Sequence, residues 1–211
     1  MQVADATRSQ RTSGPGNPPS AVAGASGRAD APGAPGARFQ ARAVTPAHLA
    51  PPPASPLGLA AYSGPGPALW LSSCHGGAGT STLAALVPQA WSAGRYWPAP
   101  EPPGQARVLL VARTHAAGLC AAQAAARQWA AGVLPGVRLL GLVAVADAPG
   151  KLPKPLRDLL RLISGGVPRV WELPWADSLR LGDPPDRAKL PSAYARLSQD
   201  LERIISEDAH A

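Results

Sequence analysis

Three glycines lie close together in the segment Cys74–Thr82, which reads CHGGAGTST. At Gly76, Gly77 and Gly79 a phosphate group could approach the backbone closely, because no Cβ atom stands in the way. The segment follows an apolar run and precedes a helical pattern. A glycine-rich turn in this position directs several backbone N–H groups, and the partial positive charge of a helix start, at one point. The pattern therefore indicates a phosphate-binding loop, although a tight turn that binds nothing has the same residues.

Other residues capable of chemistry lie beside this loop or at the ends of apolar runs. Cys74 and His75 are the types that form a nucleophilic pair, but neighbours at a strand end point in opposite directions, which favours a packed thiol. Arg113 and Asp147 each follow an apolar run, and open α/β sheets bind ligands at the carboxyl ends of their strands. We expect a phosphate contact or a solvated loop at Arg113, and a base contact or a turn at Asp147.

The elements that must position these residues alternate between two hydrophobic patterns. Continuous apolar runs, which suit buried parallel strands, occupy 68–73, 107–112, 137–146 and 167–173. Helical spacing of apolar residues marks 80–93, 116–131, 156–164 and 192–206. Pro88 is expected to kink or shorten the first of these helices, and a proline-rich loop is predicted at 96–106. Strands that alternate with helices predict a compact three-layer α/β domain, with a parallel sheet and helices on both faces.

Composition divides the chain into two parts. Residues 1–66 hold 11 of the 26 Pro and 9 of the 22 Gly, and such a segment cannot bury enough apolar surface to offset the entropy of ordering. We therefore predict a disordered arm over 1–66 and the α/β domain over 67–211. Two cysteines exclude a disulfide framework, and Cys120 is expected to be a small core residue. No apolar segment suits a secretory signal or a membrane span, so a cytoplasmic protein is expected.

The glycine segment resembles the deviant Walker A loop of the ParA/MinD family of P-loop ATPases, which reads Lys-Gly-Gly-x-Gly-Lys-Thr-Thr. In this resemblance His75 takes the position of the signature lysine. Gly76, Gly77 and Gly79 match the family glycines, and Ala78 takes the variable position between them. The resemblance implies a P-loop-like fold whose loop binds the phosphates of a nucleotide.

The remaining positions carry the resemblance further. Thr80 stands where the family has its Walker lysine, Ser81 matches the hydroxyl that ligates Mg²⁺, and Thr82 matches the last hydroxyl. A weaker likeness extends over about 68–205 and places Asp147 at the loop that contacts adenine. ATP or ADP with Mg²⁺ is therefore the cofactor that the resemblance implies.

Two departures from the family pattern bear on activity. Both lysines are absent, and Thr80 cannot supply the fixed positive charge that a transferred phosphate needs, whereas His75 carries charge only when protonated. Arg113 stands where a Walker B carboxylate would hold Mg²⁺. The sequence therefore favours a non-enzymatic nucleotide-binding switch or pseudo-ATPase that acts by docking partners. The alternatives are an interaction module that has lost the nucleotide, and an active, weak positioning or partition ATPase.

Several partners are consistent with the charge and the aromatic residues. The formal net charge is +7, and ParA-like proteins bind DNA non-specifically through basic surfaces. Five basic residues give either a solvated helix face or such a surface: Lys151, Lys154, Arg157, Arg161 and Arg169. Trp171 and Trp175 form either core or a site for a protein partner. A homodimer partner is a further source of a missing lysine. The Ala-, Gly-, Pro- and Arg-rich usage is typical of a high-GC bacterial genome, such as an actinobacterial one.

Overall fold

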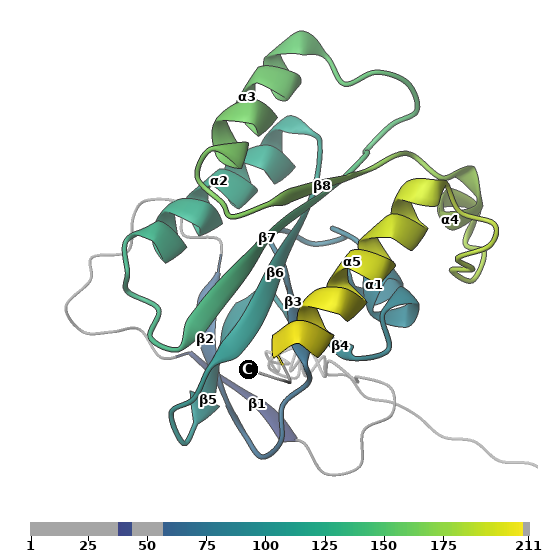
Figure 1. The fold of residues 1–211 in the computed structure, drawn as a ribbon. Helices are drawn as coiled ribbons and strands as arrows, with labels where there is room; N and C mark the ends of the chain where they lie inside the picture. Colours follow the sequence, from purple (N-terminus) through teal and green to yellow (C-terminus); the bar gives the residue numbers. More distant parts are fainter. Residues whose placement is uncertain (1–37, 44–56, 209–211) are drawn as a thin grey trace, which may run out of the picture. The chain divides into compact units, whose positions relative to one another are not determined.

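The computed structural model describes residues 38–43 and 57–208, and its larger sheet has five parallel strands (Figure 1). These strands are Leu69–Ser73 (β3), Ala90–Gly94 (β4), Ala106–Arg113 (β6), Val137–Val145 (β7) and Val170–Leu173 (β8). Their spatial order is β4-β3-β6-β7-β8. In chain order this is 2-1-3-4-5, one of the common arrangements of doubly wound α/β sheets. The chain changes direction across the sheet between β3 and β6, so the ends of these two strands lie where such sheets bind ligands.

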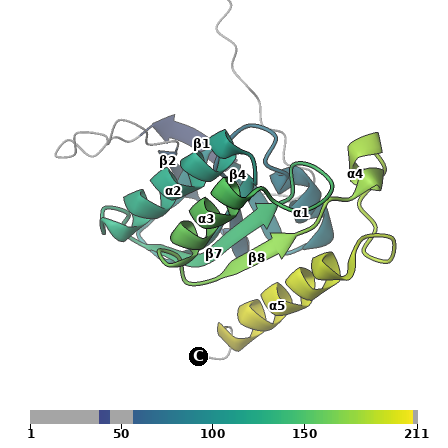
Figure 2. The ribbon, with the colours of Figure 1, turned by 90° about the horizontal axis from the view of Figure 1, so that it is seen from above.

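Five helices lie in the described part of the chain. They are Thr80–Leu86 (α1), Ala116–Ala130 (α2), Lys154–Ser164 (α3), Asp177–Leu181 (α4) and Ser192–Asp208 (α5). One hydrophobic core contains Leu119 of α2 and Ile163 of α3, and a separate core contains Leu83 of α1 and Leu201 of α5. Figure 2 shows α2 and α3 on one side of the sheet and α5 on the other. The predicted α/β fold with a parallel sheet and helices on both faces is confirmed.

A second, three-stranded sheet covers part of the face on which α2 packs. Its strands are Arg38–Ala43 (β1), Gly58–Ser63 (β2) and Tyr96–Glu101 (β5), in the order β1-β2-β5. Trp97 of β5 is fully buried, and its Nε1–H donates to Oε1 of Gln128 on α2 at 2.8 Å. The amide of Gln128 in turn donates to the backbone oxygen of Leu57 at 3.2 Å. This sheet therefore belongs to the same packed core as α2.

The predicted helix over 80–93 is wrong beyond its second turn. Helix α1 ends at Leu86, and β4 begins at Ala90. The cause is Pro88, because a proline disfavours helical backbone at the residue before it. Val87 accordingly adopts an extended conformation, with φ −125° and ψ 90°. Of the two effects expected from this proline, the structure shows the shortened helix.

Two predictions of irregular structure are corrected as well. The proline-rich segment predicted as a loop at 96–106 contains β5, which pairs with β2 in parallel. Prolines are tolerated there because β5 is an edge strand of the three-stranded sheet. Strands β1 and β2 lie inside the predicted arm 1–66, so the arm prediction does not hold for 38–43 and 57–63. The rest of the arm lies outside the described residues.

Smaller expectations have mixed outcomes. The helices predicted at 116–131 and 192–206 are confirmed to within a few residues. Cys120 is exposed on α2 and is not the core residue that was expected. No helix in the described part of the chain combines the length and the apolar character needed to cross a bilayer.

Candidate functional site

The glycine loop connects β3 to α1 and exposes bare backbone. Gly77 and Gly79 have φ values of +74° and +104°, which lie in the left-handed region that glycine adopts most readily. A Cβ atom added at Gly76, Gly77 or Gly79 would meet no other atom within 4 Å. No side chain caps the start of α1. The loop therefore leaves open space above its backbone, and its glycines are needed for conformation more than for close packing.

The loop residues predicted to bind a cofactor separate into two groups. Gly79 and Thr82 line a pocket that is described below, and Gly76 and Gly77 are exposed beside it. Ala78, Thr80 and Ser81 do not line it. Ala78 and Thr80 are buried, and Ser81 is exposed. Of the loop residues predicted to bind a cofactor, the structure therefore brings only Gly79 and Thr82 into the pocket.

His75 joins the glycine loop to the end of β6. Its Nε2 accepts the backbone N–H of Arg113 at 2.9 Å, and its Nδ1 lies 2.9 Å from the backbone oxygen of Gly76. Nδ1 must therefore carry the proton and Nε2 must be free of one, which is the neutral imidazole. Burial lowers the pKa of His75, and the charges of His115, Arg113 and Arg95 add to that effect, against the hydrogen bond to Gly76. This geometry favours a structural role for His75, which holds the glycine loop to the end of β6, over a role as a substitute for the signature lysine.

Cys74 does not have the surroundings of a nucleophile. Its side chain is fully buried, and burial raises the pKa of the thiol to about 12. A catalytic cysteine needs a lowered pKa and access to the substrate. The packed thiol that the sequence favours is the arrangement that the structure supports.

Arg113 carries positive charge to the carboxyl edge of the sheet, beside the glycine loop. Its Nη1 donates to the backbone oxygen of Ala146 at 3.0 Å, and its Nε lies 3.4 Å from the backbone oxygen of Gly77. A guanidinium has five N–H donors, so these two contacts leave others available to a ligand. Arg113 is half-buried, and it is held from three sides, since His75 also fixes its backbone.

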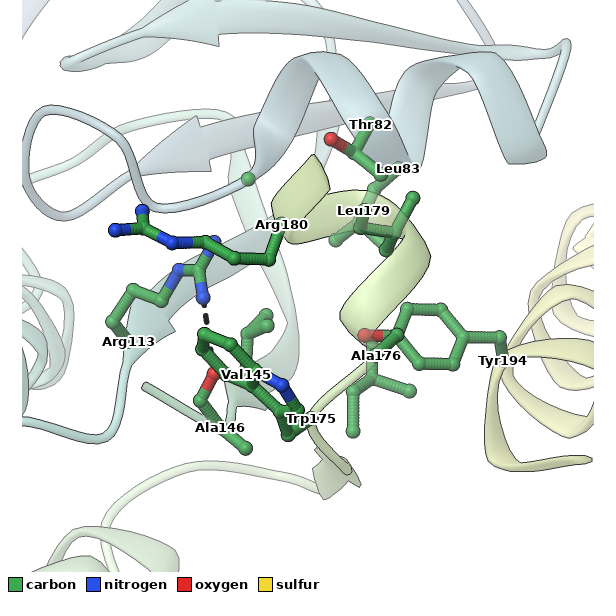
Figure 3. A pocket seen from close by; sticks show the side chains of 12 residues that line it. Thr82, Leu83, Arg113, Val145, Ala146, Trp175, Ala176, Leu179, Arg180 and Tyr194 are labelled. Atoms are coloured by element: carbon green, nitrogen blue, oxygen red, sulfur yellow. Dashed lines mark hydrogen bonds between the residues drawn. The ribbon is translucent and has the colours of Figure 1, made fainter. Parts of the chain in front are cut away.

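A pocket of about 130 Å³ opens between Arg113, the end of the glycine loop and α4 (Figure 3). Strands β6, β7 and β8 contribute the residues at or just beyond their carboxyl ends, among them Val145 and Leu173. The opposite wall consists of Trp175, Leu179 and Arg180. In Figure 3 the side chain of Arg180 extends from α4 toward the side on which Arg113 lies. Two guanidinium groups and an indole ring therefore line one pocket at the carboxyl edge of the sheet.

The comparison with protein families identifies the family to which the chain belongs. Residues 67–191 match the model of a family described as a family of unknown function (DUF6668). The chain belongs to this family. None of the curated proteins compared with the chain matches it. The DUF6668 match includes every lining residue of the pocket except Tyr194, which α5 supplies.

The lining of the pocket in this DUF6668 protein fits an anion better than a metal ion. No Asp or Glu lines the pocket, and no group of three or more His, Cys, Asp or Glu in the described ranges could hold a metal. Ser81, the Mg²⁺ ligand that the resemblance implies, does not line this pocket. A phosphate group fits, because arginine binds its oxygens with paired, charge-assisted hydrogen bonds.

Asp147 and the basic residues of α3 contribute little to this site. Asp147 is exposed and does not line the pocket, and its backbone N–H donates to Oγ1 of Thr114 at 3.2 Å. Lys154 and Arg161 both pair with Asp158, at 2.7 and 3.3 Å. These ion pairs favour a solvated helix face over a DNA surface.

Part of the pocket is not predicted by the sequence. Trp175 is expected there only as core or partner surface, and Arg180 lies in a segment without periodicity between β8 and α5. Tyr194 of α5 also lines the pocket, and its hydroxyl donates to the backbone oxygen of Pro174 at 3.0 Å. The end of the apolar run 167–173 is a signal that could have pointed to this region, because ligands bind beyond the carboxyl ends of parallel strands.

Proposed function

We propose that this protein binds the phosphate groups of a nucleotide, ATP or ADP, without hydrolysing it, and acts as a ligand-operated switch. The observation that carries the proposal is the pocket that combines Gly79 of the glycine loop with the guanidinium groups of Arg113 and Arg180. Arg113 supplies the fixed positive charge that the missing lysines do not. The P-loop-like character proposed for the fold is limited to this strand, glycine loop and helix.

The size of the pocket decides which part of the ligand it holds. At about 130 Å³ it is smaller than pockets that enclose whole small molecules, which begin near about 300 Å³. A phosphate group therefore occupies it, while the sugar and base lie outside. Trp175 offers an aromatic face near the opening, against which a purine ring can lie.

Hydrolysis has no support in the residues that line the pocket. Phosphoryl transfer depends on positioning and on stabilising the charge of the transition state, usually with Mg²⁺ held by a carboxylate. No carboxylate lines the pocket. No lining histidine is available as a base either, since His75 lies outside the lining and already bonds Arg113 and Gly76. A bound nucleotide is therefore retained as a signal.

A partner surface is proposed beside the ligand site. Leu181 directly follows Arg180 and is 81% exposed, the most exposed of the large apolar side chains described. A ligand that draws Arg180 inward changes how Leu181 is presented to a partner. Because Leu181 is next to Arg180, the bound nucleotide would control the docking of a protein partner at Leu181.

A thermal-shift series with the full chain tests the proposal. ATP, ADP, AMP and pyrophosphate are compared with and without EDTA, because a ligand that binds only the folded state raises the melting temperature. We expect stabilisation by ADP, ATP and pyrophosphate in the presence of EDTA. Gly79→Val should abolish it, because a β-branched residue is strained at a φ of +104°. Gly165→Ala at the end of α3 is the control outside the loop, since a Cβ there meets only an ordinary contact at 3.6 Å. If no nucleotide shifts the wild-type melting temperature, the proposal fails.

A further inference from the structure

We infer that α4 is a lid, and that its Arg180 is a second phosphate ligand that closes onto a metal-free phosphate held by Arg113. This inference rests on the proposed function and specifies the chemistry of the same site. It assigns to Arg180 a role as a specificity-determining residue for a phosphate that carries no Mg²⁺.

The first support is the weak attachment of α4 itself. This helix has five residues, none of them buried, and it ends at Gly182 with a φ of +89°. Leu179 packs only partly against the core, and Leu181 is exposed. Local unfolding and movement concentrate where few apolar contacts are buried. The helix can therefore move without disturbing the core.

The second support is that the segment is fastened on both sides of α4. Before it, the hydroxyl of Tyr194 donates to the backbone oxygen of Pro174 at 3.0 Å. After it, Nε of Arg187 donates to the backbone oxygen of Leu86 at 2.9 Å, and Arg187 also pairs with Glu202 at 3.0 Å. A short segment between two fixed points, with a flexible glycine inside it, is suited to hinge motion.

The third support is the availability of Arg180. Its side chain is exposed and lines the pocket, and it has no hydrogen bond or ion pair with any residue that the structure describes. Asp177, three residues earlier, is its natural helical partner. The carboxylate of Asp177 instead accepts a hydrogen bond from Nε1 of Trp175 at 2.7 Å. The guanidinium is therefore left free for a ligand.

The charges identify the class of ligand. Arg113 and Arg180 line the same small pocket, and no carboxylate lining it balances them. A doubly charged phosphate group relieves the repulsion between two like charges and accepts several N–H donors. A Mg²⁺ ion bound to the same phosphate would remove that charge and would meet two cations. The site therefore prefers ADP or pyrophosphate to their magnesium complexes.

Limited proteolysis of the full chain with trypsin tests the lid. Trypsin cleaves after arginine, so an exposed α4 is cut between Arg180 and Leu181, and mass spectrometry identifies the fragments. We expect pyrophosphate with EDTA to slow this cut at least tenfold, and excess MgCl₂ to restore it. Arg113→Ala should be cut at the same rate with and without pyrophosphate.

Calorimetry with the same ligand separates the two proposals. Arg180→Ala should weaken pyrophosphate binding at least tenfold, Arg180→Lys should recover part of it, and Arg196→Ala on α5 is the control that removes an exposed arginine elsewhere. Wild-type binding that is unaffected by Arg180→Ala, with no protection of the bond after Arg180, overturns the lid and leaves the proposed function standing. Absence of binding to the wild-type protein overturns both.

Discussion

The two walls of the pocket differ in how firmly the chain holds them. On one wall, Arg113 is fixed through its backbone by His75 and through its side chain by the carbonyl oxygens of Ala146 and Gly77. On the other wall, Arg180 belongs to a five-residue helix without a buried residue and has no partner among the described residues. Both walls present the same functional group. The difference is that one guanidinium is in place before a ligand arrives and the other is not.

In the proposed switch, the two arginines would have different roles: Arg113 would provide affinity for the ligand, and Arg180 would provide the change that a partner detects. A group that is already positioned loses little conformational freedom on binding, so the fixed wall provides the basal attraction for an anion. A group that must be ordered costs free energy, but its movement alters the surface around it. Helix α4, which carries Arg180, also carries the exposed Leu181. A switch needs both kinds of wall, and each can be tested separately.

The largest expected effect comes from breaking the fixed wall at Gly118. A Cβ atom at this position would lie 2.3 Å from the backbone oxygen of Arg113 and 2.9 Å from Nε2 of His75. Gly118→Val should therefore destabilise the fold by about 3 kcal/mol, the upper part of the range for overpacking. Urea denaturation measures the change, and Gly76→Ala, whose Cβ is unobstructed, should stay within about 0.5 kcal/mol of the wild type. A wild-type stability for Gly118→Val would show that Arg113 and His75 are not tightly packed against Gly118.

A smaller effect should distinguish the two arginines in the absence of ligand. Arg113→Ala removes two hydrogen bonds to backbone oxygens and should lower the free energy of unfolding by about 1–2 kcal/mol. Arg180→Ala removes no described contact and should change it by less than about 0.5 kcal/mol. Chemical denaturation of both variants provides the comparison. Equal losses would mean that α4 is held as firmly as the end of β6.

A weaker, pH-dependent effect should appear at His75. Burial lowers its pKa in the folded state, so protonation favours the unfolded state. Stability should be complete above the ordinary histidine pKa of about 6.5 and should fall as the pH drops below it. His75→Gln keeps an acceptor for the N–H of Arg113 but cannot titrate, so its melting temperature should depend less on pH between 7 and 5. An identical pH dependence in both proteins would place the titration elsewhere.

The smallest effect is expected at Leu181, the exposed residue that follows Arg180 on α4. Leu181→Ser should leave the free energy of unfolding within about 0.5 kcal/mol of the wild type, because the side chain is 81% exposed. It should also leave ADP binding unchanged, since Leu181 does not line the pocket. Denaturation and calorimetry check both expectations. A large loss of stability would reveal a contact that makes α4 part of the packed fold.

The same contrast explains how much the sequence could predict. The strands that hold Arg113 in place are long apolar runs, and the loop glycines adopt backbone conformations that favour glycine. Both features could therefore be predicted from residue types. The order β4-β3-β6-β7-β8 was not, because long-range pairing leaves no local pattern. Helix α4 was missed because a one-turn helix without a buried face has no periodicity. Arg180 could not be linked to Arg113 until the structure placed both residues on one pocket.

The orientation of His75 illustrates the same limit within a single residue. Its position in the loop suggested a replacement for a lysine, but the hydrogen bond from the N–H of Arg113 fixes it as a neutral acceptor. That contact joins residues 38 positions apart in the chain. Only the pairing of β3 with β6 brings them together, and sequence spacing does not reveal it.

The most direct test of a phosphate site at this pocket is a calorimetric titration of ADP into the full chain in the presence of EDTA, with Arg113→Ala measured alongside. We expect saturable binding of one ADP per chain, at least tenfold weaker in Arg113→Ala. Absence of heat at any ADP concentration, or equal affinity in the two proteins, would contradict it.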